Sequence, residues 1–228
     1  MELLQHLLSA DASAPRLSVY NEADGTRMDF SAQTLENWTS KISNMLLEEL
    51  DLEPDSDSRI LIDLPVSWQA AVIALGALAA GVPFDVTDGA AATQPPADEI
   101  AVVFTSPEAF SEGSGISGAD TVLVTQDPFG RGVVESGGEL PVGTIDFGPT
   151  VRFYGDHFYG TTTPLPELFP TDLGAERVLS PGWSDTASFQ RAVLEPLAAG
   201  GSAVIVAGLC SADRLEEIAG NEKVTVRA

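Results

Sequence analysis

Residues 59–86 read RILIDLPVSWQAAVIALGALAAGVPFDV, and this stretch decides the fold. Its centre, Ser67–Ala80, has the length of a helix and is almost wholly apolar, so this helix must be buried against a sheet. Gly81 is a residue type that commonly ends a helix. Apolar strands are predicted on either side, at Arg59–Leu64 and Phe84–Val86. A strand–helix–strand unit of this kind predicts a parallel pair of strands joined by a right-handed crossover.

The same alternation of strands and helices extends in both directions from this unit. Further strands are predicted at Leu17–Asn21, Arg27–Phe30, Ile100–Thr105, Thr121–Thr125, Arg177–Leu179, Ser202–Ala207 and Lys223–Val226. Helical spacing and capping residues predict helices around Leu3–Leu8, from Ser31 to about Leu50, from about Thr186 to Ala199, and after Ser211. Glycines interrupt any period from Gln126 to Pro170, which is therefore interpreted as loops and short irregular pieces.

The predicted fold class is α/β, with one or more layered, mainly parallel sheets flanked by helices. A second β-α-β-α-β run follows the glycine-rich stretch and has the same layout as the first, which places a boundary near residue 145. We therefore expect two α/β subregions, residues 1–145 and residues 146–228. The pattern is also compatible with one compact unit.

Charge and cysteine content restrict the partners and the compartment. The 228 residues carry a formal net charge of −23 and include only Lys41 and Lys223 as lysines, so nucleic acid and an anionic membrane surface would be repelled. The longest apolar stretch, Ala70–Phe84, is shorter than the ~20 residues of a membrane-spanning helix. With no leader pattern and a single cysteine, Cys210, we expect a soluble cytoplasmic protein. These features are compatible with a homo-oligomer.

Short motifs that carry chemistry are weak in this chain. Residues 113–118 read GSGISG and match the dinucleotide-binding pattern G-x-G-x-x-G by letter, but a strand follows them instead of preceding them, which favours a plain loop. The imidazoles are those of His6 and His157, and the sequence has no G-x-S-x-G elbow that would supply a nucleophile. The aspartates of the acidic loop 51–58 lack the spacing of a calcium site. We therefore assign no catalytic residue, no metal and no cofactor.

Two stretches resemble the adenylate-forming superfamily of acyl-CoA synthetases, luciferases and nonribosomal-peptide adenylation domains. The first is the segment 59–86, which is similar to the family's strand, proline, helix and A-G turn. The second begins at Arg177 with RVLSPGWSDTASFQRAVLEPLAAGGSAVIV and continues through SADRLEEIAGNEKVTVRA to Ala228. Because the pieces occur in family order, the chain resembles a shortened N-terminal portion of such an enzyme, like short uncharacterised AMP-binding-like proteins. The resemblance implies the family's layered α/β fold.

Departures from the family pattern predict that its chemistry is lost. The family's phosphate loop, S-G-T-T-G-x-P-K-G, has its nearest match at residues 159–164, YGTTTP, where Thr163 replaces the second glycine and no lysine follows. Glycine N–H groups and a lysine are what such a loop offers to phosphate. The family's histidine is missing near Trp183, and its adenine-binding segment and lysine-bearing domain would follow residue 228.

The resemblance and its departures lead to two readings of function. In the first, we expect a catalytically inactive scaffold that binds a small molecule or a protein. In the alternative, the chain is a partial acyl-adenylating enzyme, a ligase or synthetase that another chain completes.

A residual binding site is expected where the predicted strand Arg177–Leu179 leads into a helix start. In open α/β sheets, ligands settle outside the carboxyl ends of the strands. The candidate ligand-binding residues are Trp183, Ser184 and Asp185, with Tyr159, Thr161 and Thr162 as neighbours. In a purely structural alternative, Ser184 or Thr186 caps the helix, Trp183 packs beneath it, and Asp185 suits the positive end of the helix dipole.

Overall fold

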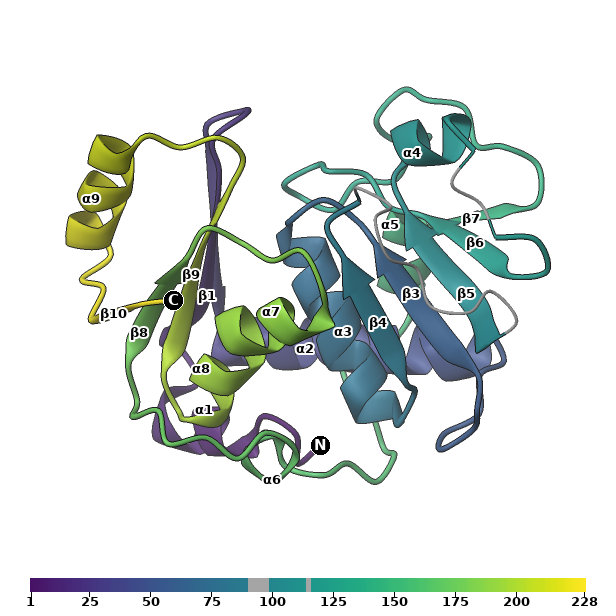
Figure 1. Ribbon diagram of the computed structural model, residues 1–228. Coiled ribbons are helices and arrows are strands. Elements are labelled where there is room, and N and C mark those ends of the chain that lie inside the picture. Colours follow the sequence, from purple (N-terminus) through teal and green to yellow (C-terminus); the bar gives the residue numbers. More distant parts are fainter. Residues whose placement is uncertain (90–98, 114–115) are drawn as a thin grey trace. The chain divides into compact units, whose positions relative to one another are not determined.

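The computed structural model describes residues 1–89, 99–113 and 116–228, and it contains two five-stranded sheets, each with its own helices (Figure 1). The chain divides into two compact units. The first unit is formed by Met1, Asn37–Pro65 and Gln69–Thr162, and the second by Glu2–Glu36, Val66–Trp68 and Thr163–Ala228. Each unit is therefore discontinuous in sequence, whereas the sequence analysis drew a single boundary near residue 145.

The sheet of the first unit is parallel throughout, as predicted, with the strand order β4-β3-β5-β6-β7. Its strands are β3 (Arg59–Asp63), β4 (Phe84–Thr87), β5 (Ile100–Thr105), β6 (Asp120–Leu123) and β7 (Thr144–Asp146). Its helices include α3 (Trp68–Ala80), α4 (Pro107–Ser111), α5 (Phe147–Phe153) and most of α2 (Ala32–Glu48). The chain adds β4 on one side of β3 and then returns to add β5 on the other.

Helix α3 lies at the centre of this unit, as its apolar sequence predicts, and its residues 70–77 are all buried. Helix α2 crosses it closely at Gly76, where an added Cβ would lie 2.6 Å from the Cβ of Ile42. The Ser43 hydroxyl donates a hydrogen bond to the Gly76 carbonyl at 3.0 Å. Glycine is thus required at this crossing, because a side chain would push the two helices apart. Gly81 ends α3 with a positive φ of 69°.

Both faces of the first sheet are covered. On one face, Phe104 of β5 packs edge to face against Phe147 of α5, with ring centroids 6.3 Å apart. On the other, Leu61 and Val103 pack with residues of the β5–β6 connection such as Ile116. Successive strand residues point to opposite faces, so covering both faces accounts for the continuous apolar runs Ile60–Ile62 of β3 and Ile100–Phe104 of β5.

The second unit has the strand order β10-β8-β9-β1-β2, parallel except for the β1–β2 hairpin. Its strands are β1 (Pro15–Asn21), β2 (Thr26–Ser31), β8 (Arg177–Ser180), β9 (Ser202–Ala207) and β10 (Val226–Arg227). Its helical segments are α1 (Gln5–Asp11), α6 (Leu165–Leu168), α7 (Thr186–Phe189), the π-helical η2 (Gln190–Leu194), α8 (Glu195–Ala198) and α9 (Ala212–Asn221). The predicted hairpin and the helix after Ser211 are confirmed.

The helix predicted from Thr186 to Ala199 consists of α7, the π turn η2 and α8 in succession. Pro196 explains the π turn. In a regular α-helix its ring would collide with the carbonyl of Ala192, and it has no N–H to donate. The Glu195 N–H instead bonds the Gln190 carbonyl, five residues back, which widens the helix just before the proline.

A buried polar network fastens the end of α9 to its sheet. Glu222 is 8% exposed, and its carboxylate accepts hydrogen bonds from Tyr20 Oη (2.5 Å), Arg27 Nε (2.8 Å) and Arg177 Nη2. Arg177 Nη2 also donates to Ser18 Oγ at 2.8 Å. Burial acts to raise the pKa of Glu222, but the hydrogen bonds from Tyr20, Arg177 and Arg27 outweigh it, so the pKa lies below its ordinary value.

Three short elements, β7, α5 and α6, form inside the stretch that the sequence analysis interpreted as irregular. Each spans seven residues or fewer, too short for a periodic pattern to stand out among the glycines and prolines. Within the described residues, every helix is too short or too polar to cross a membrane.

Candidate functional site

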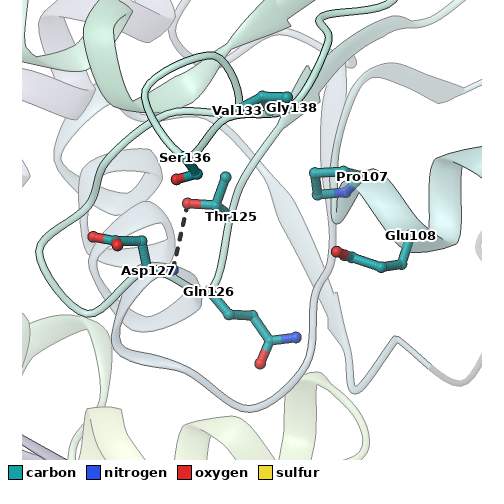
Figure 2. Close-up of a pocket in the computed structure, with 8 residues that line it drawn as sticks. All are labelled: Pro107, Glu108, Thr125, Gln126, Asp127, Val133, Ser136 and Gly138. Atoms are coloured by element: carbon teal, nitrogen blue, oxygen red, sulfur yellow. Dashed lines mark hydrogen bonds between the residues drawn. The ribbon is translucent and has the colours of Figure 1, made fainter.

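A pocket of about 400 Å³ opens in the first unit, at the carboxyl ends of β5 and β6. Its volume falls in the range of roughly 300–1,000 Å³ that is usual for small-molecule sites. Figure 2 shows Pro107 and Glu108 of α4 on one side, facing Thr125 and Ser136 across the pocket. The lining residues are Pro107, Glu108, Thr125, Gln126, Asp127, Val133, Ser136 and Gly138. The carboxyl edge of an open parallel sheet is where ligands of α/β proteins commonly bind.

Most of the wall comes from residues 124–143, which connect β6 to β7 and are called the pocket loop below. Connections longer than roughly 12–15 residues without regular structure are uncommon, and many of them are functional. This loop is held at its base by Gln69, a buried residue in the first turn of α3. The Gln69 side-chain amide donates to the carbonyls of Thr125 (3.1 Å) and Asp127 (2.9 Å). The first lining residues are therefore fixed to the central helix.

The turn of the pocket loop is organised by Asp127. Its carboxylate accepts hydrogen bonds from the backbone N–H groups of Phe129 (2.9 Å) and Arg131 (3.2 Å) and from Arg131 Nε (2.9 Å). The Thr125 hydroxyl donates to the Arg131 carbonyl and closes the turn. Burial acts to raise the pKa of Asp127, but these bonds, first those from the Arg131 side chain, lower it below its ordinary value. The carboxylate form is thus stabilised as part of the wall.

Two glycines let the pocket loop pack directly on the β7–α5 junction. The Asp146 carboxylate accepts from the N–H groups of Val133 (3.0 Å) and Val134 (3.3 Å). A Cβ on Gly132 would lie 2.5 Å from Asp146 Oδ2, and one on Gly148 would lie 2.6 Å from the Gly130 carbonyl oxygen. Because such contacts are closer than real Cβ atoms tolerate, only glycine allows this approach.

A salt bridge completes the outer part of the wall. Arg152 of α5 pairs with both carboxylate oxygens of Glu135, at 2.6 and 2.5 Å, and also donates to the Gly130 carbonyl at 2.9 Å. Glu135 in turn accepts from the Gly132 N–H at 2.8 Å. These bonds within the protein hold the loop in a defined shape, which is the condition that precise binding requires.

The polar side chains of the pocket differ in whether they already have a hydrogen-bond or ion-pair partner within the protein. Arg131 is paired with Asp127, at 2.8 Å, so its charge is balanced beside the pocket. Among the residues that the structure describes, the side chains of Glu108, Gln126 and Ser136 have no hydrogen-bond or ion-pair partner. These groups could receive a ligand. The apolar part of the lining comes from Pro107 and the buried Val133.

Two of the residues predicted around the helix start of the second unit, Trp183 and Asp185, make contacts that also stabilise the fold. Trp183 is 5% exposed and packs edge to face against Phe189, with ring centroids 4.9 Å apart. Asp185 is the N-cap of α7, and it forms a capping box in which it accepts from the Ser188 N–H at 2.6 Å. The side-chain hydrogen bond from Ser188 holds the pKa of Asp185 below its ordinary value. The cap is thus Asp185, between the Ser184 and Thr186 named in the structural alternative. Ser184 is exposed.

The other predicted site residues lie in the first unit. Tyr159 is 93% exposed, Thr161 is exposed and Thr162 is buried. Ligand binding by these residues and by Trp183, Ser184 and Asp185 stays a prediction. The preceding segment is tied to α2, because Lys41 Nζ donates to the Tyr154 carbonyl (2.7 Å) and pairs with Asp156 (2.8 Å).

The pocket was not predicted from the sequence, although the sequence contains two local features of its loop, a turn-capping aspartate and closely spaced glycines. Asp127-Pro128 followed by Gly130 and Gly132 combines a residue that caps turns with glycines that allow close approach. Nothing in the sequence indicates that Asp146 and Gly148 pack on them. Elsewhere, the described residues contain no group of three or more His, Cys, Asp or Glu side chains arranged to hold a metal. Of the GSGISG stretch, Ser114 and Gly115 lie outside the described residues.

Comparison with solved structures identifies the fold. The chain is similar to an acyl-CoA synthetase from Brucella canis, with a TM-score of 0.73 and 17% identity over 100% of this chain and 47% of that one. It is also similar to acetoacetyl-CoA synthetase from Streptomyces lividans, with a TM-score of 0.71 and 16% identity over 98% of this chain and 41% of that one. A benzoate CoA ligase from Burkholderia xenovorans matches with a TM-score of 0.66 and 16% identity over 100% of this chain and 50% of that one.

The chain therefore spans about half the length of the solved enzymes that it resembles. At these identities the likeness shows the fold, which is that of the N-terminal portion of adenylate-forming enzymes. No protein-family model matches the chain. A protein of Mycobacterium tuberculosis described as a "TIGR03089 family protein" is 33% identical over 242 residues, which cover 98% of this chain and 95% of that protein. On this similarity the chain belongs to the TIGR03089 family, and it has an adenylate-forming-like α/β fold.

Proposed function

We propose that this protein is a catalytically inactive relative of the adenylate-forming enzymes that binds a small molecule in the pocket at the carboxyl ends of β5 and β6. The observation that carries the proposal is the pocket loop, whose shape is set by hydrogen bonds to Gln69, Asp127 and Asp146. Preorganisation of this kind lowers the entropic cost of binding.

Loss of adenylation is supported by the segment that corresponds to the family's phosphate loop. Residues 159–164 offer Thr163 in place of a glycine and are followed by no lysine. Lys41, which lies near the start of this segment, is already bonded to Tyr154 and Asp156. A triphosphate needs several cationic or N–H donors that are free to receive it.

Calorimetry with ATP and Mg²⁺, and pyrophosphate exchange with a panel of carboxylic acids, test the loss of adenylation. We expect neither heat of binding nor exchange. Tight ATP binding, or exchange with any acid, would refute the inactive assignment.

Pocket binding is tested separately by screening small molecules with amide NMR spectra of the full chain. Ser136→Trp should fill the pocket and remove the shifts of the pocket-loop signals, because Ser136 lines it. Val142→Trp is the matched control, since Val142 is fully exposed in the same loop and does not line the pocket. Equal binding by both variants would place the ligand elsewhere.

A second candidate is a partial acyl-adenylating enzyme completed by another chain. It is favoured by the match to only about half of each solved synthetase. Affinity purification from the native cell tests it. A stoichiometric partner that carries an adenylation C-terminal domain, and that restores pyrophosphate exchange when mixed with this chain, would establish this alternative over the first.

A further inference from the structure

We infer that the pocket selects a ligand with a protonated amine on an apolar body, an inference that rests on the proposed function of the pocket. The charged groups that line it are Glu108 and Asp127, and both are acidic. Asp127 is neutralised by Arg131, at 2.8 Å. The Glu108 carboxylate has no partner among the described residues and lies opposite Thr125 and Ser136 (Figure 2).

A carboxylate or phosphate ligand fits this lining poorly. It would approach Glu108 directly, and the nearby guanidinium of Arg131 already has a counter-ion. Arg152, the other arginine of the wall, is likewise paired with Glu135. The net charge of −23 adds a long-range field that attracts cations and repels anions. Both the local and the global electrostatics therefore favour a positive ligand.

The uncharged lining residues indicate what kind of molecule would carry the amine. Pro107 and Val133 provide apolar surface, on which a small aromatic or aliphatic body can be buried. The Glu108 carboxylate can accept from an ammonium group, and the amide of Gln126 and the hydroxyl of Ser136 add further polar surface to the lining. A primary amine thus offers a counter-charge to the unpaired Glu108 carboxylate, which a neutral or anionic molecule does not.

Three probes that share a phenylethyl group test this inference: 2-phenylethylamine, 2-phenylethanol and 3-phenylpropanoate. Their binding to the full chain is measured by NMR titration of the pocket-loop amides at low salt. The amine should bind roughly five- to tenfold more tightly than the alcohol, because it adds one charge-assisted hydrogen bond and an ion pair. The carboxylate should bind most weakly. Raising the ionic strength should reduce the advantage of the amine.

Glu108→Gln should remove the preference for the amine and leave the affinity for the alcohol unchanged. Glu112→Gln is the matched control, because Glu112 is an exposed acid at the other end of α4 and does not line the pocket. If the alcohol and the amine bind equally, or if Glu108→Gln keeps the preference, the inference fails while the pocket still stands as a binding site. If none of the three probes shifts the pocket-loop signals, the inference and the proposed pocket both fail.

Discussion

Gly132→Ala should open the wall of the pocket without affecting the second unit. Gly132 has an ordinary backbone conformation, so the substitution acts only through the added methyl group. That methyl would lie 2.5 Å from Asp146 Oδ2 and 2.5 Å from Pro149 Cδ. The nearest contact is with Asp146 Oδ1, and to bring it to an ordinary 3.4 Å the loop and the β7–α5 junction must separate by about 1 Å.

The energetic cost follows from what this separation breaks. The Val133 and Val134 N–H groups donate to Asp146 at 3.0 and 3.3 Å, and a further separation of about 1 Å would take both beyond hydrogen-bonding distance. Overpacking of a tight site costs about 1–3 kcal/mol, and a lost hydrogen bond to a charged group costs about 1.5–3 kcal/mol. Since the loop can relax partly into solvent, we expect a loss of about 2 kcal/mol in the stability of the first unit.

Urea unfolding and NMR titration with 2-phenylethylamine measure the two consequences. We expect a lower denaturation midpoint and at least a tenfold weaker affinity, because Val133 and Ser136 lie in the shifted segment. Gly155→Ala is the control, since a Cβ there meets nothing within 4 Å. If Gly132→Ala matches the wild type in both measurements, the packing of the loop on Asp146 does not hold the pocket.

Three further predictions concern the core, the polar network and the predicted helix-start site. Ala74→Asp should prevent folding of the first unit, because it places an unpaired charge in a helix that is fully buried; a soluble variant with unchanged melting would contradict this placement. Glu222→Ala should cost about 3 kcal/mol by removing the counter-ion of Arg177 and the acceptor of the Tyr20 hydroxyl, whereas Glu216→Ala, which breaks an exposed pair with Arg227, should leave the melting temperature unchanged. Folding lowers the pKa of Glu222, so its ionised carboxylate stabilises the folded state fully above the ordinary value of 4.5. This contribution disappears as the pH falls through the lowered pKa. The melting curves of wild type and Glu222→Ala should therefore converge in acid. Trp183→Ala should lower the stability by about 3 kcal/mol, because it opens a cavity against Phe189. If this variant lost only ligand affinity and kept its stability, the result would instead support a binding role for Trp183.

The secondary structure could be predicted well where a strong local pattern agrees with burial. The apolar run of α3, the hairpin β1–β2 and the capped helix α9 lie where periodicity, turn residues and Ser211 place them. The helix start after Trp183 was also predicted, but not its cap, because Ser184, Asp185 and Thr186 are all competent N-cap residues and local sequence does not rank them.

The candidate pocket could not be predicted from the sequence, because its wall depends on contacts between distant segments. Gln69 of α3 holds Thr125 and Asp127, and Asp146 holds Val133, across separations that no short motif records. Likewise, Glu222 and Tyr20 are 202 residues apart in the chain and 2.5 Å apart in the fold.

The sequence by itself determined the fold class, since the repeated alternation of strands with helices, one of them almost wholly apolar, is typical of a parallel sheet covered by helices. It also determined the acidic surface and the departures from the phosphate loop, because these are properties of residue types at given positions. Only the tertiary structure decided that the chain forms two sheets and that a glycine-rich connection becomes the wall of a pocket. The physical reason is that glycines widen the conformations open to a chain, and the choice among them is made by the carboxylates and amides that pack against it.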